Sequence, residues 1–403
     1  MALEKTWRWF GFKDPIRLEY LTQMGVEGVV TALHHIPNGE VWPVEEIMTV
    51  KKAIEAHGMR WSVVESLPVS EGIKTASDDL PRLLANYRES LRNLGKCGID
   101  TVVYNFMPVI DWVRTDLTYK LPKGGESMYF DLPTFAAFDI FLLNRPGALN
   151  DYPQELAEKA RNIAGNLTPE QADELVYNII VVTQGFINGV IDGSVTDPKK
   201  VFLEFLSRYK AIDRNRLRQN LKTFLDDVVP VAAASGINLC VHPDDPPFPV
   251  LGLPRIVSTP DDIAWIMEAH DSLHNGFAFC VGSLSARPDN DLELVVKKYG
   301  HRIHFSHLRN TQLLPDGSFY ESGHLDGSQN MAGLVKLLLL EQRRRCLEGR
   351  QDYRMPFRPD HGIKMLTDYD HKYNPGYPLI GRLKGLAEIE GLMAGLENVL
   401  ENQ

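Results

Sequence analysis

Short apolar runs recur along the 403-residue chain, and each is followed by a polar residue or a helix breaker and then by a helical pattern. Eight runs have the length of a strand buried on both faces, which shows as continuous apolar sequence and not as an alternation. They span residues 7–10, 28–33, 61–65, 101–106, 238–242, 276–281, 303–308 and 355–360. The pattern therefore predicts eight strands of a parallel sheet.

Helical segments separate these strands. Residues 43–58 and 80–98 carry apolar positions at three- and four-residue spacing, and each segment stops at a glycine. Thr259, Pro260 and Asp261 open another helix, and residues 383–400 form a terminal amphipathic helix. Because strands that alternate with helices build a parallel sheet, and eight repeats favour closure, we expect a single α/β domain over residues 1–403 with a (β/α)8 TIM-barrel fold.

One connection is much longer than the others. About 130 residues separate the fourth and fifth predicted strands, against about 25 to 50 elsewhere. Within it, residues 153–163, 168–175 and 197–224 show helical periodicity and caps. We interpret residues 115–230 as a helical insertion after the fourth strand, which would form a lid over the active site or an oligomer contact.

Composition and charge narrow the class of protein. The apolar fraction of 44% and the charged fraction of 24% are those of a soluble globular protein. A net charge of −10 argues against a nucleic-acid partner, because phosphate backbones are bound by lysine and arginine. No apolar run is long enough for a membrane span, no signal peptide is read, and the four cysteines form no CxxC pair, so we expect a cytoplasmic protein with no membrane partner.

Metal-competent side chains follow four consecutive predicted strands. His242 ends the fifth strand, Cys280 the sixth, His307 the seventh and Asp360 the eighth. Since the catalytic residues of such barrels come from the carboxyl ends of strands, we expect these four side chains to bind one divalent transition ion. Each could alone be a core or turn residue, and it is their coincidence at one rim that favours a metal site.

The donor set leaves the metal open between two readings. Thiolate and imidazole ligands favour zinc on softness, but four protein ligands would close a tetrahedral zinc site and make it structural. A catalytic ion needs further coordination positions, which favours a five- or six-coordinate ion such as Mn2+ or Fe2+.

The strand-end motifs RWFG, VTALHH, ESLPV, YNFMPV, HPDDPP, FCVGS, HLRN and RPDHG, with the later NPGYP, closely resemble the mannonate dehydratase family over nearly the whole chain. That resemblance implies a xylose isomerase-like barrel, metal binding by the same four residues with Mn2+ or Fe2+, and a place in hexuronate catabolism, including glucuronate degradation. It implies loss of water from D-mannonate to give 2-keto-3-deoxy-D-gluconate. It also associates His361 and Tyr377 with catalysis, although Tyr369 and Tyr373 lie nearby.

Further residues are candidates for binding a small sugar-acid substrate. Arg309 is placed to bind a carboxylate or hydroxyls, or to form a salt bridge at the rim. His34, His35 and Asn105 lie at the ends of the second and fourth strands, and Trp9 and Trp112 would line the pocket or belong to the core.

Rival functions remain open at this stage. They are a metal-dependent sugar isomerase or epimerase, a barrel phosphodiesterase acting on DNA, and a non-catalytic binding protein. Family members and the long insertion suggest a homo-oligomer, a dimer or higher.

Overall fold

Eight parallel strands close into a barrel in the computed structural model, which describes residues 2–183 and 194–401. The barrel strands are β1 (Glu4–Arg8), β2 (Gly28–Thr31), β3 (Arg60–Glu65), β4 (Thr101–Tyr104), β7 (Asn238–Val241), β8 (Asn275–Cys280), β9 (Ile303–His307) and β12 (Pro356–Arg358). The ring closes because β1 pairs with both β2 and β12. Each strand overlaps one of the eight apolar runs, so the predicted TIM barrel is confirmed.

Side chains fill the inside of the barrel. One fully buried cluster takes a residue from each of six successive strands, namely Val30, Val63, Val103, Cys240, Ala278 and Phe305. Gly276 on β8 permits a close approach of β9, because a Cβ there would lie 2.2 Å from the carbonyl oxygen of Arg302. The barrel is thus a packed core, and ligands must bind at one of its ends.

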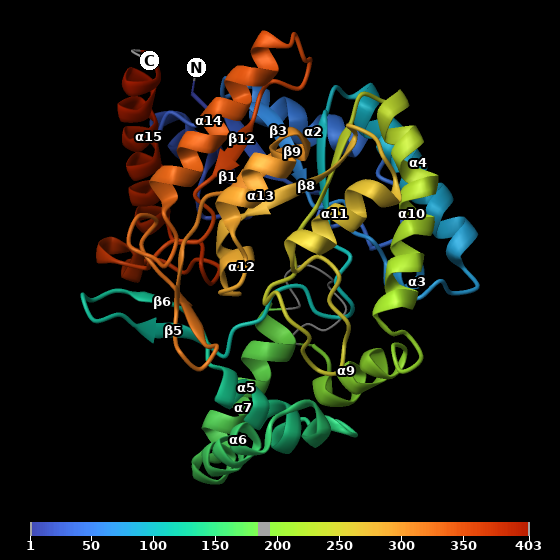
Figure 1. Ribbon diagram of the computed structural model, residues 1–403, viewed down its shortest axis with the longest axis vertical. Helices are drawn as coiled ribbons and strands as arrows, with labels where there is room; N and C mark the ends of the chain where they lie inside the picture. The colour runs from blue at the N-terminus through green and yellow to red at the C-terminus, as the bar shows by residue number, and fades with distance from the viewer. Residues whose placement is uncertain (1, 184–193, 402–403) are drawn as a thin grey trace.

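Helices surround the strands (Figure 1). The longer ones are α2 (Val44–Glu55), α4 (Leu80–Lys96), α10 (Arg214–Ala234), α11 (Pro260–Ala269), α13 (Leu292–Tyr299), α14 (Met331–Leu347) and α15 (Leu379–Glu401), and the short ones are α1 (Leu18–Gln23), α3 (Glu71–Lys74) and α12 (Val281–Ser285). The predicted start of α11 is confirmed, since Thr259 and Asp262 form a reciprocal capping box. None of the helices in the described ranges combines the length and hydropathy that a membrane span requires.

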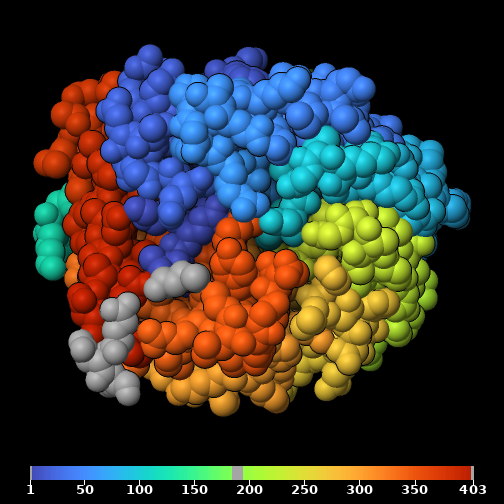
Figure 2. All heavy atoms as spheres, turned by 90° about the horizontal axis from the view of Figure 1, so that it is seen from above, coloured from blue at the N-terminus to red at the C-terminus, as the bar shows by residue number. Residues whose placement is uncertain are grey.

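The first and last parts of the chain lie side by side, because β1 pairs with β12. Figure 2 looks onto the end of the barrel at which both chain ends lie, and it shows the first helices beside the last ones. Lys5 on β1 forms an ion pair with Glu390 on α15, with 2.6 Å between Nζ and Oε1. The amino-terminal ends of the barrel strands therefore face this side.

The insertion lies at the opposite end of the barrel (Figure 1). Its helices are α5 (Leu132–Ala137), α6 (Gln154–Asn166), α7 (Pro169–Tyr177) and α9 (Pro198–Ser207), whereas α10 packs against α4 and belongs to the ring. Before these helices the insertion also contains two strands that were not predicted, because β5 (Asp116–Lys120) and β6 (Glu126–Phe130) form an antiparallel hairpin.

A second sheet connects the insertion to the loop that follows β9. That loop contains β10 (Thr311–Leu313) and β11 (Phe319–Glu321), and the four strands lie in the order β10-β11-β6-β5. Phe319 on β11 is the register partner of Phe130 on β6, and their rings stack with centroids 5.3 Å apart. Two loops that are distant in sequence are therefore fixed against each other above the carboxyl ends of the barrel strands.

Candidate metal centre and active site

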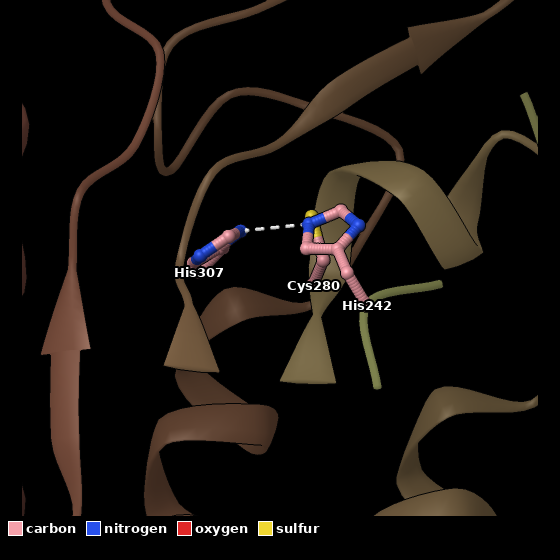
Figure 3. Close-up of side chains that lie close together, drawn as sticks. All are labelled: His242, Cys280 and His307. Atoms are coloured by element: carbon pink, nitrogen blue, oxygen red, sulfur yellow. Dashed lines mark hydrogen bonds between the residues drawn. The ribbon is translucent and has the colours of Figure 1, made fainter. Parts of the chain in front are cut away.

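The register of the barrel brings three metal-competent side chains together. Cys280 at the end of β8 is the register partner of His307 at the end of β9. His242 directly follows β7, where its backbone N–H donates to the carbonyl oxygen of Tyr104. Their donor atoms all lie within 4.8 Å of one another, and Figure 3 shows the two imidazoles facing each other beside the sulfur. Three of the four predicted ligands therefore meet in one place.

A hydrogen bond at His242 and a carboxylate beside His307 orient the two imidazoles for a cation. The Nδ1 atom of His242 lies 2.7 Å from the carbonyl oxygen of Pro243, to which it can only donate, so in the neutral ring that binds metals the lone pair is on Nε2. His307 has its Nε2 atom 3.0 Å from Oε1 of Glu65 and its Nδ1 atom 3.2 Å from Nε2 of His242. When both outer nitrogens donate, two lone pairs face each other across the cluster, an arrangement that a metal ion stabilises. The donor set therefore fits a divalent transition ion.

The third donor is a thiol in a strongly positive environment. Cys280 is fully buried, and burial alone raises the pKa of its thiol, but the charge of Arg309 and the neighbouring His307 and His242 lower this pKa well below its usual value. The hydroxyl of Ser283 also donates to the sulfur, at 3.1 Å. The thiolate, which is the form that binds metals, is thereby favoured.

Asp360, the fourth predicted ligand, lies beside the cluster and is engaged by two arginines. Its Oδ2 atom is 3.7 Å from Nδ1 of His307 and 2.9 Å from Nε of Arg309, while Oδ1 accepts from Arg358. Its φ of 62° is a strained value for a residue other than glycine, a feature that concentrates at functional sites. To bind the same ion as the other three, its carboxylate must exchange part of these arginine contacts. The ligand role of Asp360 stays a prediction.

A polar cavity lies next to the cluster, at the carboxyl ends of the barrel strands. Its lining includes seven residues singled out from the sequence, which are Asn105, Trp112, His242, Arg309, Asp360, His361 and Tyr377. Cys280 and His307 do not belong to this lining and are buried, with 0% and 1% of their surface exposed. The candidate metal centre is therefore approached from the cavity through His242 and Asp360.

His361 and Tyr377 are neighbours in this cavity. Their rings meet edge to face with centroids 5.1 Å apart, and Phe10 packs on the other side of Tyr377 at 4.9 Å. Burial raises the pKa of Tyr377 to about 12, so its phenol stays protonated near neutral pH. Of the three nearby tyrosines, Tyr377 lines this cavity, whereas Tyr369 is largely exposed and stacks on Lys120 and Lys364. The structure therefore favours Tyr377 over Tyr369 as a catalytic candidate.

His34, His35 and Trp9 lie outside the lining of the cavity. His35 is exposed and its Nε2 atom is 3.1 Å from the carboxylate of Glu46, on the outer side of the loop that follows β2. His34 is also exposed, and its ring lies 6.4 Å from that of Phe10, which in turn packs on the cavity-lining Tyr377. Trp9 is buried in the hydrophobic core, and its ring meets that of the exposed Phe12 edge to face. Trp9 therefore belongs to the core, and the substrate contacts of His34 and His35 stay predictions.

Arg309 is buried and its guanidinium is shared among carboxylates. Its Nη2 atom is 2.5 Å from Asp245 and its Nε atom 2.9 Å from Asp360, while Nη1 donates to Glu321. Asp245 and Glu321 are in turn bridged by Arg114, at 2.7 Å from each. Of the two alternatives posed for Arg309, the salt bridge is the one present, although at the floor of the cavity and not at an exposed rim.

Apart from Arg309 and Asp360, the residues of this ion network were not identified from the sequence. Asp245 belongs to HPDDPP, which follows the fifth predicted strand, and Glu65 ends the third strand in ESLPV, so both offered a strand-end signal. Arg8 and Arg358 also end strands and line the cavity. Glu321 carried no such signal, because the second sheet brings it to Arg309 and His361.

The Nδ1 atom of His361 has two partners, and the one it bonds to decides whether His361 can act as a base or as an acid. It lies 3.1 Å from Oε1 of Glu321 and 2.9 Å from Nη1 of Arg309. Donation from Nδ1 to Glu321 leaves Nε2 with a lone pair, as a base requires, whereas acceptance from Arg309 puts the proton on Nε2, as an acid requires. Burial raises the pKa of Glu321, but Arg309, His361 and Arg114 outweigh it and bring this pKa to about 2, so the carboxylate is an acceptor.

A closed (β/α)8 barrel with a His–Cys–His cluster and a polar cavity at the carboxyl ends of its strands defines the class of this protein, a TIM-barrel enzyme with a candidate metal centre. The family description "D-mannonate dehydratase (UxuA)" matches residues 3–403. The chain therefore belongs to the D-mannonate dehydratase family, and the resemblance noted in its motifs is confirmed.

Individual relatives agree with this assignment. The chain is 47% identical to the mannonate dehydratase of Marinomonas sp. (strain MWYL1), over 99% of this chain and 100% of the relative. It is 48% identical to that of Chromohalobacter salexigens, over 98% and 100% of the two chains. The crystal structure of mannonate dehydratase from Streptococcus suis serotype 2 superposes with a TM-score of 0.77 at 30% identity, and the match covers 99% of this chain and 95% of that one.

Proposed function

We propose that this chain removes water from D-mannonate to give 2-keto-3-deoxy-D-gluconate, with Mn2+ or Fe2+ held by His242, Cys280, His307 and Asp360. The observation that carries the proposal is the donor cluster beside a cavity that also presents His361 and Tyr377, in a chain of the mannonate dehydratase family. A divalent ion supplies Lewis acidity, which offsets the charge that develops when a proton leaves the carbon next to a carboxylate.

The reaction needs one base and one acid on this chain. The C2–H bond breaks and its electrons form the C2–C3 double bond, while the C3–O bond breaks and the hydroxide takes a proton to leave as water. The resulting enol becomes the 2-keto acid by tautomerisation, so no oxidant or reductant is consumed. Two side chains that touch the substrate from one cavity wall can move these two protons.

His361 and Tyr377 suit the base and the acid respectively. With Nδ1 donating to Glu321, Nε2 of His361 can accept the C2 proton. Tyr377 keeps its proton because burial raises its pKa to about 12, and its ring lies 5.1 Å from that of His361. We therefore assign proton abstraction to His361 and protonation of the leaving hydroxyl to Tyr377.

The test is turnover of D-mannonate by the purified protein with Mn2+, read as appearance of a 2-keto-3-deoxy acid. His361→Ala should keep its metal content and lose most turnover, and Tyr377→Phe should lose turnover while the matched Tyr369→Phe does not. A product that retains the water, as an isomerase or epimerase would give, contradicts the proposal. So does normal turnover by His361→Ala.

We further propose that the protein works in the cytoplasm as a homo-oligomer of two or more copies. Support for the first part is that the four cysteines are all free in the structure. Light scattering on the purified protein tests the second part, and a monomer at micromolar concentration contradicts it.

A further inference from the structure

Three arginines line the cavity, and they differ in how many of their donors the protein already uses. Arg309 is shared among Asp245, Glu321 and Asp360, as described above. Arg358 binds Glu65 through Nε and Nη2, at 3.0 and 3.1 Å, and donates to Asp360 through Nη1. The carboxylates of the protein thus occupy both guanidinium groups.

Arg8 is different. Its residue ends β1, is 7% exposed and lines the cavity. Within the described residues its guanidinium donates one hydrogen bond, from Nη1 to the backbone carbonyl of Glu65, and it forms no ion pair with a carboxylate. The group lies 5.1 Å from the ring centroid of Phe10, which supports one of its faces. A buried cation with unused donors at the wall of a cavity is a site prepared for an anion.

We propose that Arg8 binds the carboxylate of the sugar-acid substrate and thereby selects acids over neutral sugars. This inference rests on the proposed function and adds a residue to it. The guanidinium fork matches a carboxylate in two parallel hydrogen bonds, which hydroxyl groups do not reproduce.

The charges around the cavity explain why a dedicated cation is needed. Glu65, Asp111, Asp245 and Asp360 all line the cavity, and the whole chain carries a net charge of −10. An anionic substrate must therefore be drawn in by a local positive group and not by the overall field. Glu65 connects this group to the metal centre, because its backbone carbonyl accepts from Arg8 while its carboxylate lies 3.0 Å from Nε2 of His307. A carboxylate bound by Arg8 would then lie beside the metal centre, together with the adjacent carbon that loses its proton.

The experiment compares binding of D-mannonate with binding of D-mannitol, which has the same carbon chain but no carboxylate. Both ligands are titrated by calorimetry into the metal-loaded wild type and Arg8→Gln, and D-mannitol is also tested as a competitor of turnover. We expect Arg8→Gln to weaken D-mannonate binding and raise KM by roughly 100-fold, while binding of D-mannitol changes less than about threefold. Arg8→Lys should recover part of the loss, since it restores the charge but not the fork.

Two controls separate recognition of the anion from damage to the fold. Arg17→Gln removes another guanidinium that stacks on an aromatic ring, that of Tyr20, at the surface and should change neither ligand's affinity. Metal content and melting temperature of Arg8→Gln should equal those of the wild type. If Arg8→Gln binds D-mannonate as well as the wild type, or loses D-mannonate and D-mannitol equally, the inference is overturned.

The same data distinguish this inference from the proposed function. A wild type that binds D-mannonate through Arg8 but forms no 2-keto-3-deoxy acid contradicts the proposed function and leaves the anion site standing. A wild type that dehydrates D-mannonate with an unchanged KM in Arg8→Gln contradicts the anion site alone. A wild type that neither binds nor dehydrates D-mannonate overturns both.

Discussion

The Nδ1 atom of His361 lies 3.1 Å from the Oε1 atom of Glu321, a buried residue at the end of β11 in the second sheet. The hairpin formed by β5 and β6 holds β11 in place through the pairing of Phe130 with Phe319. The insertion after the fourth strand therefore contributes to the active site indirectly, by fixing the carboxylate that orients the candidate base.

Glu321→Gln should lower kcat about 10- to 100-fold, because an amide no longer favours the proton on Nδ1 of His361, and loss of such an orienting partner has effects of this size. KM for D-mannonate and metal content should change little. Steady-state kinetics and metal analysis check this expectation, with Glu126→Gln on the neighbouring strand β6 as the control. A fall in metal content equal to the fall in kcat would show that Glu321 only supports the fold of the metal centre.

Cys280→Ser should weaken metal binding about 10- to 100-fold or more, because it removes the soft anionic ligand while keeping the shape of the side chain. Cobalt loaded into the wild type should give a near-ultraviolet thiolate-to-metal charge-transfer band that Cys280→Ser lacks. Cys240→Ser is a suitable control, since Cys240 is equally buried but belongs to the barrel core. A charge-transfer band that survives in Cys280→Ser would exclude Cys280 as a ligand.

Arg114→Met should lower the free energy of unfolding by about 3–5 kcal/mol, the usual cost of leaving a buried charge uncompensated. Arg114 is fully buried and binds Asp245 with both Nη atoms, at 2.7 and 3.0 Å. Urea titration gives the measurement, and Arg82→Gln, which breaks an exposed pair with Asp79, should leave the midpoint unchanged. Equal midpoints for Arg114→Met and the wild type would mean that the buried network adds nothing to stability.

The barrel and the metal cluster could be predicted from the sequence because both follow from one rule. A strand buried on two faces leaves a continuous apolar run, and the residue after such a run lies at the carboxyl end of the barrel. That rule located His242, Cys280 and His307, which are 65 residues apart at the extremes and share no local motif. The same rule applies to Arg8 and Glu65, which end β1 and β3, although the sequence analysis did not single them out.

The second sheet and its consequences could not be predicted by that rule. β10 and β11 have three residues each, too few for a hydrophobic period to show, and β5 is half exposed. The position of Glu321 depends on this sheet, so no strand-end argument could find it. The contact of Asp360 with Arg309 likewise depends on how the ends of β12 and β9 lie in space, which spacing along the chain does not contain.

The stability of the barrel should depend on pH through a histidine outside the active site. His304 on β9 is buried, its Nε2 atom lies 2.8 Å from the carbonyl oxygen of Leu273, and its Nδ1 atom lies 3.6 Å from Asp352. Burial, assisted by the charge of Arg345, lowers the pKa of His304 from 6.5 to about 3. The folded protein therefore holds this histidine neutral at pH values at which the unfolded chain protonates it.

The sign of the effect follows from proton binding. Between pH 6.5 and about 3 the unfolded state binds one more proton at His304 than the folded state does, so the stabilising contribution is complete above pH 6.5 and is lost as the pH falls. From pH 7 to pH 5 the wild type should lose about 2 kcal/mol more than His304→Gln, at about 1.4 kcal/mol per pH unit below 6.5. Urea unfolding of both proteins at the two pH values measures the difference.

His274→Gln is the control, because His274 also binds a backbone carbonyl, that of Ile237, but is only partly buried. Equal losses in the wild type and His304→Gln would show that His304 is not the group responsible.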